Sequence, residues 1–211
     1  MKHLILNKDY AGINKALSEN PSLANEGWPY DESNTTKAHP LHRICDLVFS
    51  KNITDEEAVK IAEIFLAYGA HIDGNELIVG KDTPLLAASS LHADHVALLY
   101  ISRGADIHHP GCHGGTALHW AAWCGRSVVI KKLIDVGADI NKKCIDFLST
   151  PLFWAVMSYT EEKKSEEHLA SIKLLVDAGA DQNIPNGGGK KIFDMIDDKD
   201  EELKKILGGS K

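Results

Sequence analysis

Hydrophobic and polar positions along the chain form two kinds of segment that recur in a fixed order. The first begins at Thr and continues with apolar residues that include a small Ala-Ala pair, as in "GTALHWAA" at 115–122. The second has apolar residues at helical spacing and ends at Gly, as in "SVVIKKLIDVG" at 127–137. Residues three and four positions apart share one face of a helix. Each copy of the pattern therefore predicts a pair of helices.

The ends of these segments carry helix-capping residues at regular intervals. Thr83, Thr116 and Thr150 are 33 and 34 residues apart, and Thr before Pro or Ala is a good N-cap. Gly at the end of the second segment suits the left-handed C-cap conformation. In the two middle copies Gly follows Thr by 21 residues, and 12 to 14 mostly polar residues then lead to the next Thr. Those connections are too short for another helix and predict extended turns or hairpins.

The two recurring motifs resemble the ankyrin repeat. A period of about 33 residues with T-P-L-H-x-A is typical of that family, and "GADIN" at 137–141 is a copy of its second motif. The resemblance implies an all-α ankyrin-repeat solenoid, in which helix-turn-helix units stack and β-hairpin-like turns project from them. We expect about five repeats plus a C-terminal cap.

The family pattern also indicates where each copy lies within a single domain spanning residues 1–211. Two copies are longer than the rest, since 30 residues separate His39 from Gly69 and 29 separate Thr150 from Gly179. Both insertions fall between the two helices of a repeat. The expected parts are a degenerate N-terminal repeat at 1–25, repeats at 39–73, 83–108, 116–141 and 150–184, and a cap at 189–207.

Three segments of the chain depart from the repeat pattern. Thr54 and Glu57 form a capping-box pattern that predicts the start of a second helix. The charged "YTEEKKSEEH" at 159–168 is expected to extend a helix or loop into solvent. Trp28 and Tyr30 lie in a long connection and either pack against the first repeats or form part of a contact surface.

Composition and charge limit the classes of partner. The chain is 44% apolar and 25% charged, with a net charge of −7, which fits a soluble globular protein. An acidic balance disfavours nucleic acid and anionic membrane surfaces. The N-terminus lacks the pattern of a signal peptide, and no apolar stretch approaches the ~20 residues of a membrane span. We expect a cytoplasmic protein with reduced cysteines, because its four cysteines form no CxxC pair.

A cluster of thiols and imidazoles at 112–124 raises the possibility of a metal or thiol site. Cys112, His113, His119 and Cys124 are of the types that bind zinc. The ankyrin resemblance implies that His119 is structural and hydrogen-bonded to the nearby loop backbone. The remaining three lie on a turn and at a helix end, which need not meet at coordination distance. A metal-binding or thiol-dependent protein that uses Cys112, His113 and Cys124 is therefore kept as the alternative.

The function that the resemblance implies is protein–protein interaction without catalysis, through the concave groove and the hairpin tips. No enzyme motif appears, and we expect no cofactor, no metal, no nucleic acid or membrane partner, and a monomer. Trp123 is expected to point to solvent, with Met157 at the equivalent position one repeat on, and the two are expected to form an apolar stripe together with Leu91 one repeat earlier. The candidate partner-binding residues are Val79, Ser90, Leu91, Cys112, His113, Trp120, Trp123, Cys124, Phe147, Trp154, Met157 and Ser158.

Overall fold

The computed structural model describes residues 1–30, 32–33, 35–160 and 165–208. The chain forms two compact units, and each is described by itself. The first comprises Met1–Ile78 and Asp82–Asp106, and the second comprises Val79–Lys81 and Ile107–Lys211. Nearly all of the regular structure in the described ranges is helical, in the order that the repeat pattern predicts.

The first unit contains the degenerate N-terminal copy and two helix pairs. Helices α3 and α4 pack against each other, as do α5 and α6, and α3 also packs on α5 and α4 on α6. The two short strands pair in antiparallel fashion, with Trp28 opposite Ala38. The elements are α1 Lys2–Leu6, α2 Tyr10–Glu19, η1 Pro21–Ala24, β1 Trp28–Pro29, β2 Lys37–Ala38, α3 Pro40–Phe49, α4 Asp55–Ala67, α5 Pro84–Ser90 and α6 Asp94–Ser102.

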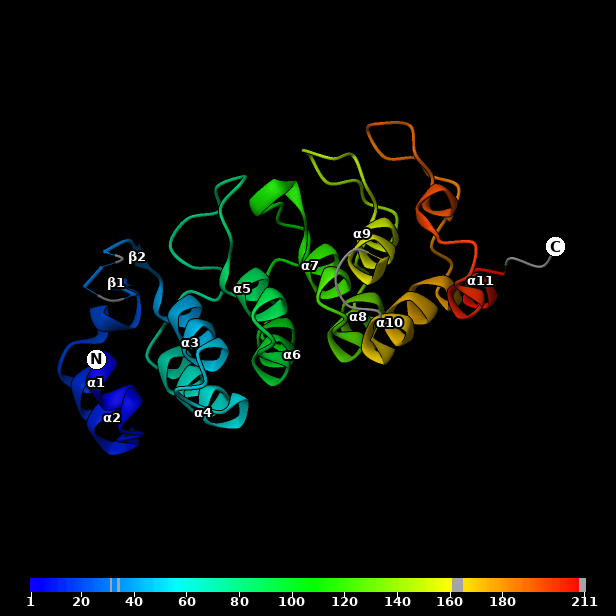
Figure 1. Ribbon diagram of the computed structural model, residues 1–211. Coiled ribbons are helices and arrows are strands. Elements are labelled where there is room, and N and C mark those ends of the chain that lie inside the picture. The colour runs from blue at the N-terminus through cyan, green and yellow to red at the C-terminus, as the bar shows by residue number, and fades with distance from the viewer. Residues whose placement is uncertain (31, 34, 161–164, 209–211) are drawn as a thin grey trace. The chain divides into compact units, whose positions relative to one another are not determined.

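The second unit contains two further helix pairs and the C-terminal cap (Figure 1). Its best-packed pair of elements is α7 and α9, the first helices of successive repeats, and α8 packs in the same way on α10. Figure 1 shows the turns that follow α8 and α10 extending on the same side of this unit. The elements are η2 Cys112–Gly114, α7 Ala117–Trp123, α8 Ser127–Asp135, α9 Pro151–Ser158, α10 Glu166–Asp177, η4 Ile192–Met195 and α11 Glu201–Ile206.

The predicted fold class is confirmed: the chain is mostly helical, and sequential helix pairs pack on one another as in an ankyrin-repeat solenoid. The only strands within the described residues are the two-residue β1 and β2. The α-helices lie within the repeat ranges given above, and the 3-10 helix η2 lies between two of them; the repeat boundaries themselves remain predictions. The single-domain boundary of 1–211 remains a prediction.

The predicted capping residues explain where the helices begin and end. The hydroxyl of Thr54 accepts a hydrogen bond from the Glu57 N–H, and the Glu57 carboxylate accepts one from the Thr54 N–H at 2.9 Å, which confirms the capping box. Thr150 accepts from the backbone N–H of Phe153. The Gly residues after the second helices have positive φ, 84° at Gly69 and 92° at Gly137, as a left-handed C-cap requires. In the charged insertion, residues 161–164 lie outside the described ranges.

A buried arginine attaches the long connection near the N-terminus to the first unit. Arg43 donates hydrogen bonds to the backbone carbonyls of Trp28 and Thr36, and it pairs with Asp46 at 2.6 Å. The Trp28 ring lies 6.2 Å from the ring of Phe65, and the Arg43 guanidinium lies 5.7 Å from the centre of the Tyr30 ring. Of the two alternatives for Trp28 and Tyr30, packing against the first repeats is the one that the structure shows.

Within each unit, a side-chain oxygen of one repeat accepts a hydrogen bond from the backbone of the next. The Asp55 carboxylate accepts from the backbone N–H of His95 at 2.6 Å, at the start of α6. In the second unit the side-chain oxygen of Asn141 accepts from the Asp181 N–H at 2.8 Å. Asn141 belongs to the Gly-Ala-Asp-x-Asn motif, so the motif residues that recur in the sequence also join successive repeats.

Candidate functional site

The site is built on the first turn of α7, where His119 fixes the backbone. The Thr116 N–H donates to His119 Nδ1 at 3.1 Å, so Nε2 carries the proton and donates to the Ser149 carbonyl at 3.2 Å. Burial lowers the pKa of His119 to about 4, because a charged imidazolium loses its hydration there. The predicted hydrogen bond of His119 to the nearby loop backbone is confirmed. Its neutral ring joins α7 to the turn before α9.

Three tryptophans from α7 and α9 meet next to this anchor. The Trp120 and Trp154 ring centres lie 5.2 Å apart with an angle of 88° between the rings. The Trp123 ring lies 6.1 Å from that of Trp154, at 79°. Edge-to-face pairs at these separations add to the stability gained by burial. The three rings therefore form a defined cluster rather than independent surface residues.

The turns before α7 and α9 add two further rings. His113 has left-handed backbone angles, with φ 57°, and its ring lies 5.1 Å from that of Phe147. His113 Nδ1 lies 2.9 Å from a carboxylate oxygen of Asp146. A Cβ at Gly114 would come within 2.3 Å of Ile145, so the two turns approach too closely for any other residue there. This contact places His113 and Phe147 side by side.

Together these side chains enclose a cavity of about 240 Å³, which we call the aromatic pocket. Its walls are mostly apolar. Trp154 is only 4% exposed and lies deepest, whereas Phe147 is 45% exposed at the rim. Trp120, Trp123 and Met157 are half-buried. The lining residues are His113, Trp120, Trp123, Phe147, Trp154 and Met157.

The indole N–H groups of Trp120 and Trp154 are buried and have no hydrogen-bond partner within the described part of the chain. A buried donor without a partner costs about 1–3 kcal/mol. An N–H directed at an aromatic face recovers part of that cost, and the edge-to-face geometry of this pair allows it. The two tryptophans therefore leave two indole N–H groups without a conventional hydrogen bond. Small apolar residues at the same positions would carry no such donor.

A residue that sequence reasoning missed, His168, holds the end of α7. Its Nε2 donates to the Trp123 carbonyl at 3.0 Å, and the Ser165 hydroxyl lies 2.8 Å from its Nδ1. His168 is buried, and a Cβ at Gly125 would lie 3.0 Å from its ring. This histidine follows the insertion between α9 and α10, so no repeat motif marks it. It fixes the backbone that carries Trp123.

The other candidate residues lie outside the pocket. Val79 is 63% exposed on the turn that belongs to the second unit. Ser90 and Leu91 are half-buried in the first unit, and Cys112 and Cys124 are half-buried in the second. Ser158 is fully buried, with its hydroxyl 3.2 Å from His168 Nε2, so it cannot contact a partner in this conformation. The structure therefore brings together the aromatic candidates with Met157.

The cysteine and histidine cluster does not assemble. No group of three or more His, Cys, Asp or Glu side chains among the described residues is arranged to hold a metal ion. His113 faces Asp146 and Phe147. Cys45 and Cys144 are buried, and desolvation raises the pKa of the Cys45 thiol. No helix in the described ranges is long and apolar enough to cross a membrane.

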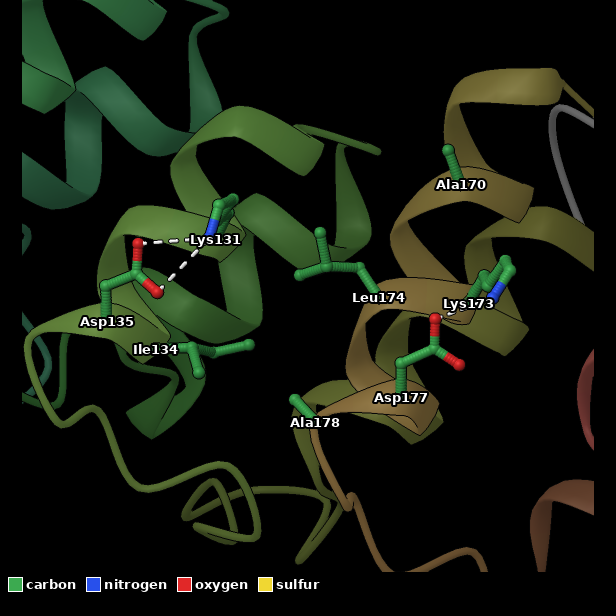
Figure 2. Close-up of a pocket in the computed structure, with 8 residues that line it drawn as sticks. All are labelled: Lys131, Ile134, Asp135, Ala170, Lys173, Leu174, Asp177 and Ala178. Atoms are coloured by element: carbon green, nitrogen blue, oxygen red, sulfur yellow. Dashed lines mark hydrogen bonds and ion pairs between the residues drawn. The ribbon is translucent and has the colours of Figure 1, made fainter.

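A larger groove of about 520 Å³ lies between α8 and α10 (Figure 2). Two exposed ion pairs flank it, Lys131 with Asp135 at 3.3 Å and Lys173 with Asp177 at 2.6 Å. Leu174 extends into the space between the two helices (Figure 2). Exposed pairs of this kind contribute little to stability or affinity. We prefer the aromatic pocket as the candidate site because its walls are apolar and more fully desolvated.

Comparisons with known proteins match part of the chain. Residues 50–144 match the family model described as ankyrin repeats (3 copies). A putative palmitoyltransferase ZDHHC13 of Danio rerio is 34% identical over 89 residues, which cover 42% of this chain and 13% of that protein. Palmitoyltransferase Hip14 of Drosophila melanogaster is 32% identical and palmitoyltransferase ZDHHC17 of Rattus norvegicus is 33% identical, with the same coverage. The match thus spans about an eighth of the length of these relatives.

Proposed function

Residues 50–144 of this chain are ankyrin repeats, and from that premise we propose that the chain is a non-catalytic module that binds a partner protein at the aromatic pocket. Stacked repeats offer a rigid surface on which side chains vary without changing the scaffold. Ankyrin repeats typically bind proteins, which supports the class of function. The position of the site rests on the pocket itself.

The observation that carries the proposal is an apolar surface that the fold does not cover. Trp123 and Met157 line a cavity that has open space above buried Trp154. Next to them, Ile145, Phe147 and Leu148 are all exposed on one turn. Exposed apolar patches and tryptophan are enriched where proteins bind one another. A partner that buried these side chains would remove them from water.

The proposal assigns no catalytic step to the chain. The relatives are named as palmitoyltransferases, but the match covers 13% of their length. We propose no metal or thiol chemistry either, because Cys112, His113 and Cys124 do not form a group of ligands. The alternative function would require the half-buried thiols of Cys112 and Cys124 to react, and neither cysteine lines the aromatic pocket.

Co-purification from the native host tests this function with matched variants. The wild-type chain and a Trp123→Ala variant are compared with Val128→Ala, which changes an exposed apolar residue on α8 outside the pocket. We expect one protein to bind the wild type and Val128→Ala but to be lost from Trp123→Ala. A partner that binds all three equally would show that the pocket is not the binding site. Reaction of the purified chain with an acyl donor would contradict the non-catalytic assignment.

A further inference from the structure

The angles between the rings limit the shape of the group that the aromatic pocket can hold. Relative to Trp154, the ring of Trp120 is inclined by 88°, that of Trp123 by 79° and that of Phe147 by 60°. Aromatic rings pack in offset stacks or edge to face, so a flat side chain could lie parallel to only some of these four rings. Rings that are inclined steeply to one another instead surround a rounded group on several sides.

The size of the pocket indicates a single side chain. Small-molecule and cofactor sites usually measure about 300–1,000 Å³, whereas this pocket measures about 240 Å³. Phe147 is the most exposed of its apolar lining residues, and it lies on the turn before α9. A long side chain entering there would place its end against Trp154.

The charge of the surroundings favours a cation at that end. The faces of aromatic rings carry partial negative charge and attract cations. None of the six lining residues is Lys or Arg. Asp146 holds a carboxylate oxygen 2.9 Å from Nδ1 of the lining residue His113. An ordinary ammonium group is strongly hydrated, so a rounded cation with apolar methyl groups fits these walls at a lower desolvation cost.

We propose that the aromatic pocket binds a methylated lysine side chain of the partner protein, with its di- or trimethylammonium group enclosed by Trp120, Trp123 and Trp154. The inference rests on the proposed function and names the chemistry that the same site recognises. The stem of the lysine would lie along Phe147 and Met157, and Asp146 would supply the nearest negative charge. The protein chain around the modified lysine would contact the exposed turn at 145–148.

A pair of probes separates the attraction of a cation from simple apolar burial. N-acetyl-trimethyllysine amide and an isostere with a neutral tert-butyl head in place of trimethylammonium are each titrated into the protein by calorimetry and tryptophan fluorescence. We expect the charged probe to bind about fivefold more tightly or better, because fivefold is the upper end for an exposed cation–π contact and desolvation strengthens it further. The unmodified lysine probe should bind more weakly than both. Equal affinities for the charged and neutral heads would overturn the proposal.

Variants locate the effect in the pocket. Trp123→Leu keeps an apolar side chain but removes one aromatic face, so the preference for the charged probe should fall toward unity. Phe193→Leu removes an exposed ring elsewhere in the same unit and should leave the preference unchanged. If Trp123→Leu fails to fold, Phe147→Leu replaces it, because Phe147 is exposed at the rim. A charged-probe preference that survives both pocket variants would contradict the assignment.

The partner protein distinguishes failure of this inference from failure of the proposed function. A partner that requires Trp123 should lose most of its affinity when it is prepared without lysine methylation. If the unmethylated partner binds equally well and still requires Trp123, the proposed function as a protein-binding module holds. The proposal that the pocket recognises a methylated lysine is then refuted. Phosphatidylcholine vesicles carry a similar headgroup. Binding to vesicles that requires Trp123, together with no binding of the lysine probe, would also refute the assignment to a protein side chain.

Discussion

Burial of the neutral His119 ring makes the stability of the second unit depend on pH. The pKa of His119 is about 4 in the folded protein, against an ordinary value of 6.5, chiefly because burial removes the hydration of the charged form. Between these two values the unfolded chain binds a proton that the folded chain does not. The contribution of neutral His119 to the free energy of unfolding is therefore complete above pH 6.5, and it is lost progressively as the pH falls toward 4.

The magnitude follows from the two pKa values. Proton linkage gives a loss of about 2 kcal/mol at pH 5 relative to pH 7 from this one residue. Replacing His119 by Ala removes this dependence, and at pH 7 it costs roughly 1–3 kcal/mol because the Thr116 N–H and the Ser149 carbonyl lose their partner. The difference in stability between the wild type and His119→Ala should narrow by about 2 kcal/mol from pH 7 to pH 5.

Urea unfolding followed by tryptophan fluorescence measures this difference. Trp120, Trp123 and Trp154 all belong to the second unit, so most of the signal reports on the part of the chain that contains His119. Burial also lowers the pKa of His39 to about 4, so the wild type will lose stability in acid for more than one reason. The comparison between variants cancels that contribution. A His119→Ala cost that is the same at pH 5 and pH 7 would refute the argument.

Three further predictions concern the pocket, the turns and metal. Trp123→Ala should weaken partner binding by ~2 kcal/mol or more and lower stability by less than the ~3–5 kcal/mol of a core tryptophan; a melting loss with unchanged affinity per folded molecule would show that Trp123 serves packing. Gly114→Ala should lower the free energy of unfolding by more than about 1–2 kcal/mol, because its Cβ would lie 2.3 Å from Ile145. At Gly137 an added Cβ would have no neighbour within 4 Å, so Gly137→Ala should cost only the backbone strain of a positive φ. Equal losses of stability for the two variants in chemical denaturation would contradict this. A strong chelator should leave the melting temperature unchanged, and unfolding on its addition would favour a metal site.

The elements that local sequence determines were predictable. Thr54 and Thr150 cap helices, and Gly69 and Gly137 end them, because each requirement concerns residues within one turn of the chain. The aromatic candidates were also found, since Trp120 and Trp154 occupy equivalent positions one repeat apart. What the sequence could not supply is the close approach of the turns, which makes a cavity from these side chains rather than a flat surface.

The residues that sequence reasoning missed act over long separations without a repeat motif. Arg43 binds the carbonyls of Trp28 and Thr36 in an irregular connection, so nothing in the period marks it. His168 contacts the Trp123 carbonyl across 45 residues and follows an insertion whose length the repeat does not specify. Ser158 stands at an equivalent of Cys124, but the local contact with His168 buries it. Such contacts depend on how insertions pack, which periodicity does not encode.

The hydrogen bonds that join successive repeats have a consequence for how the chain opens in solution. In the second unit Asn141 accepts from the Asp181 N–H, and the Gly187 N–H donates to the Phe147 carbonyl at 2.8 Å. Opening of the terminal repeat breaks both bonds and frees the turn that carries Phe147. Amide hydrogen exchange at Asp181 and Gly187, once corrected for the intrinsic rate of each amide, should therefore give the same opening free energy, as one cooperative opening. Each such opening would also release one wall of the aromatic pocket, so the lifetime of a bound partner would be coupled to the fraying of the C-terminal end.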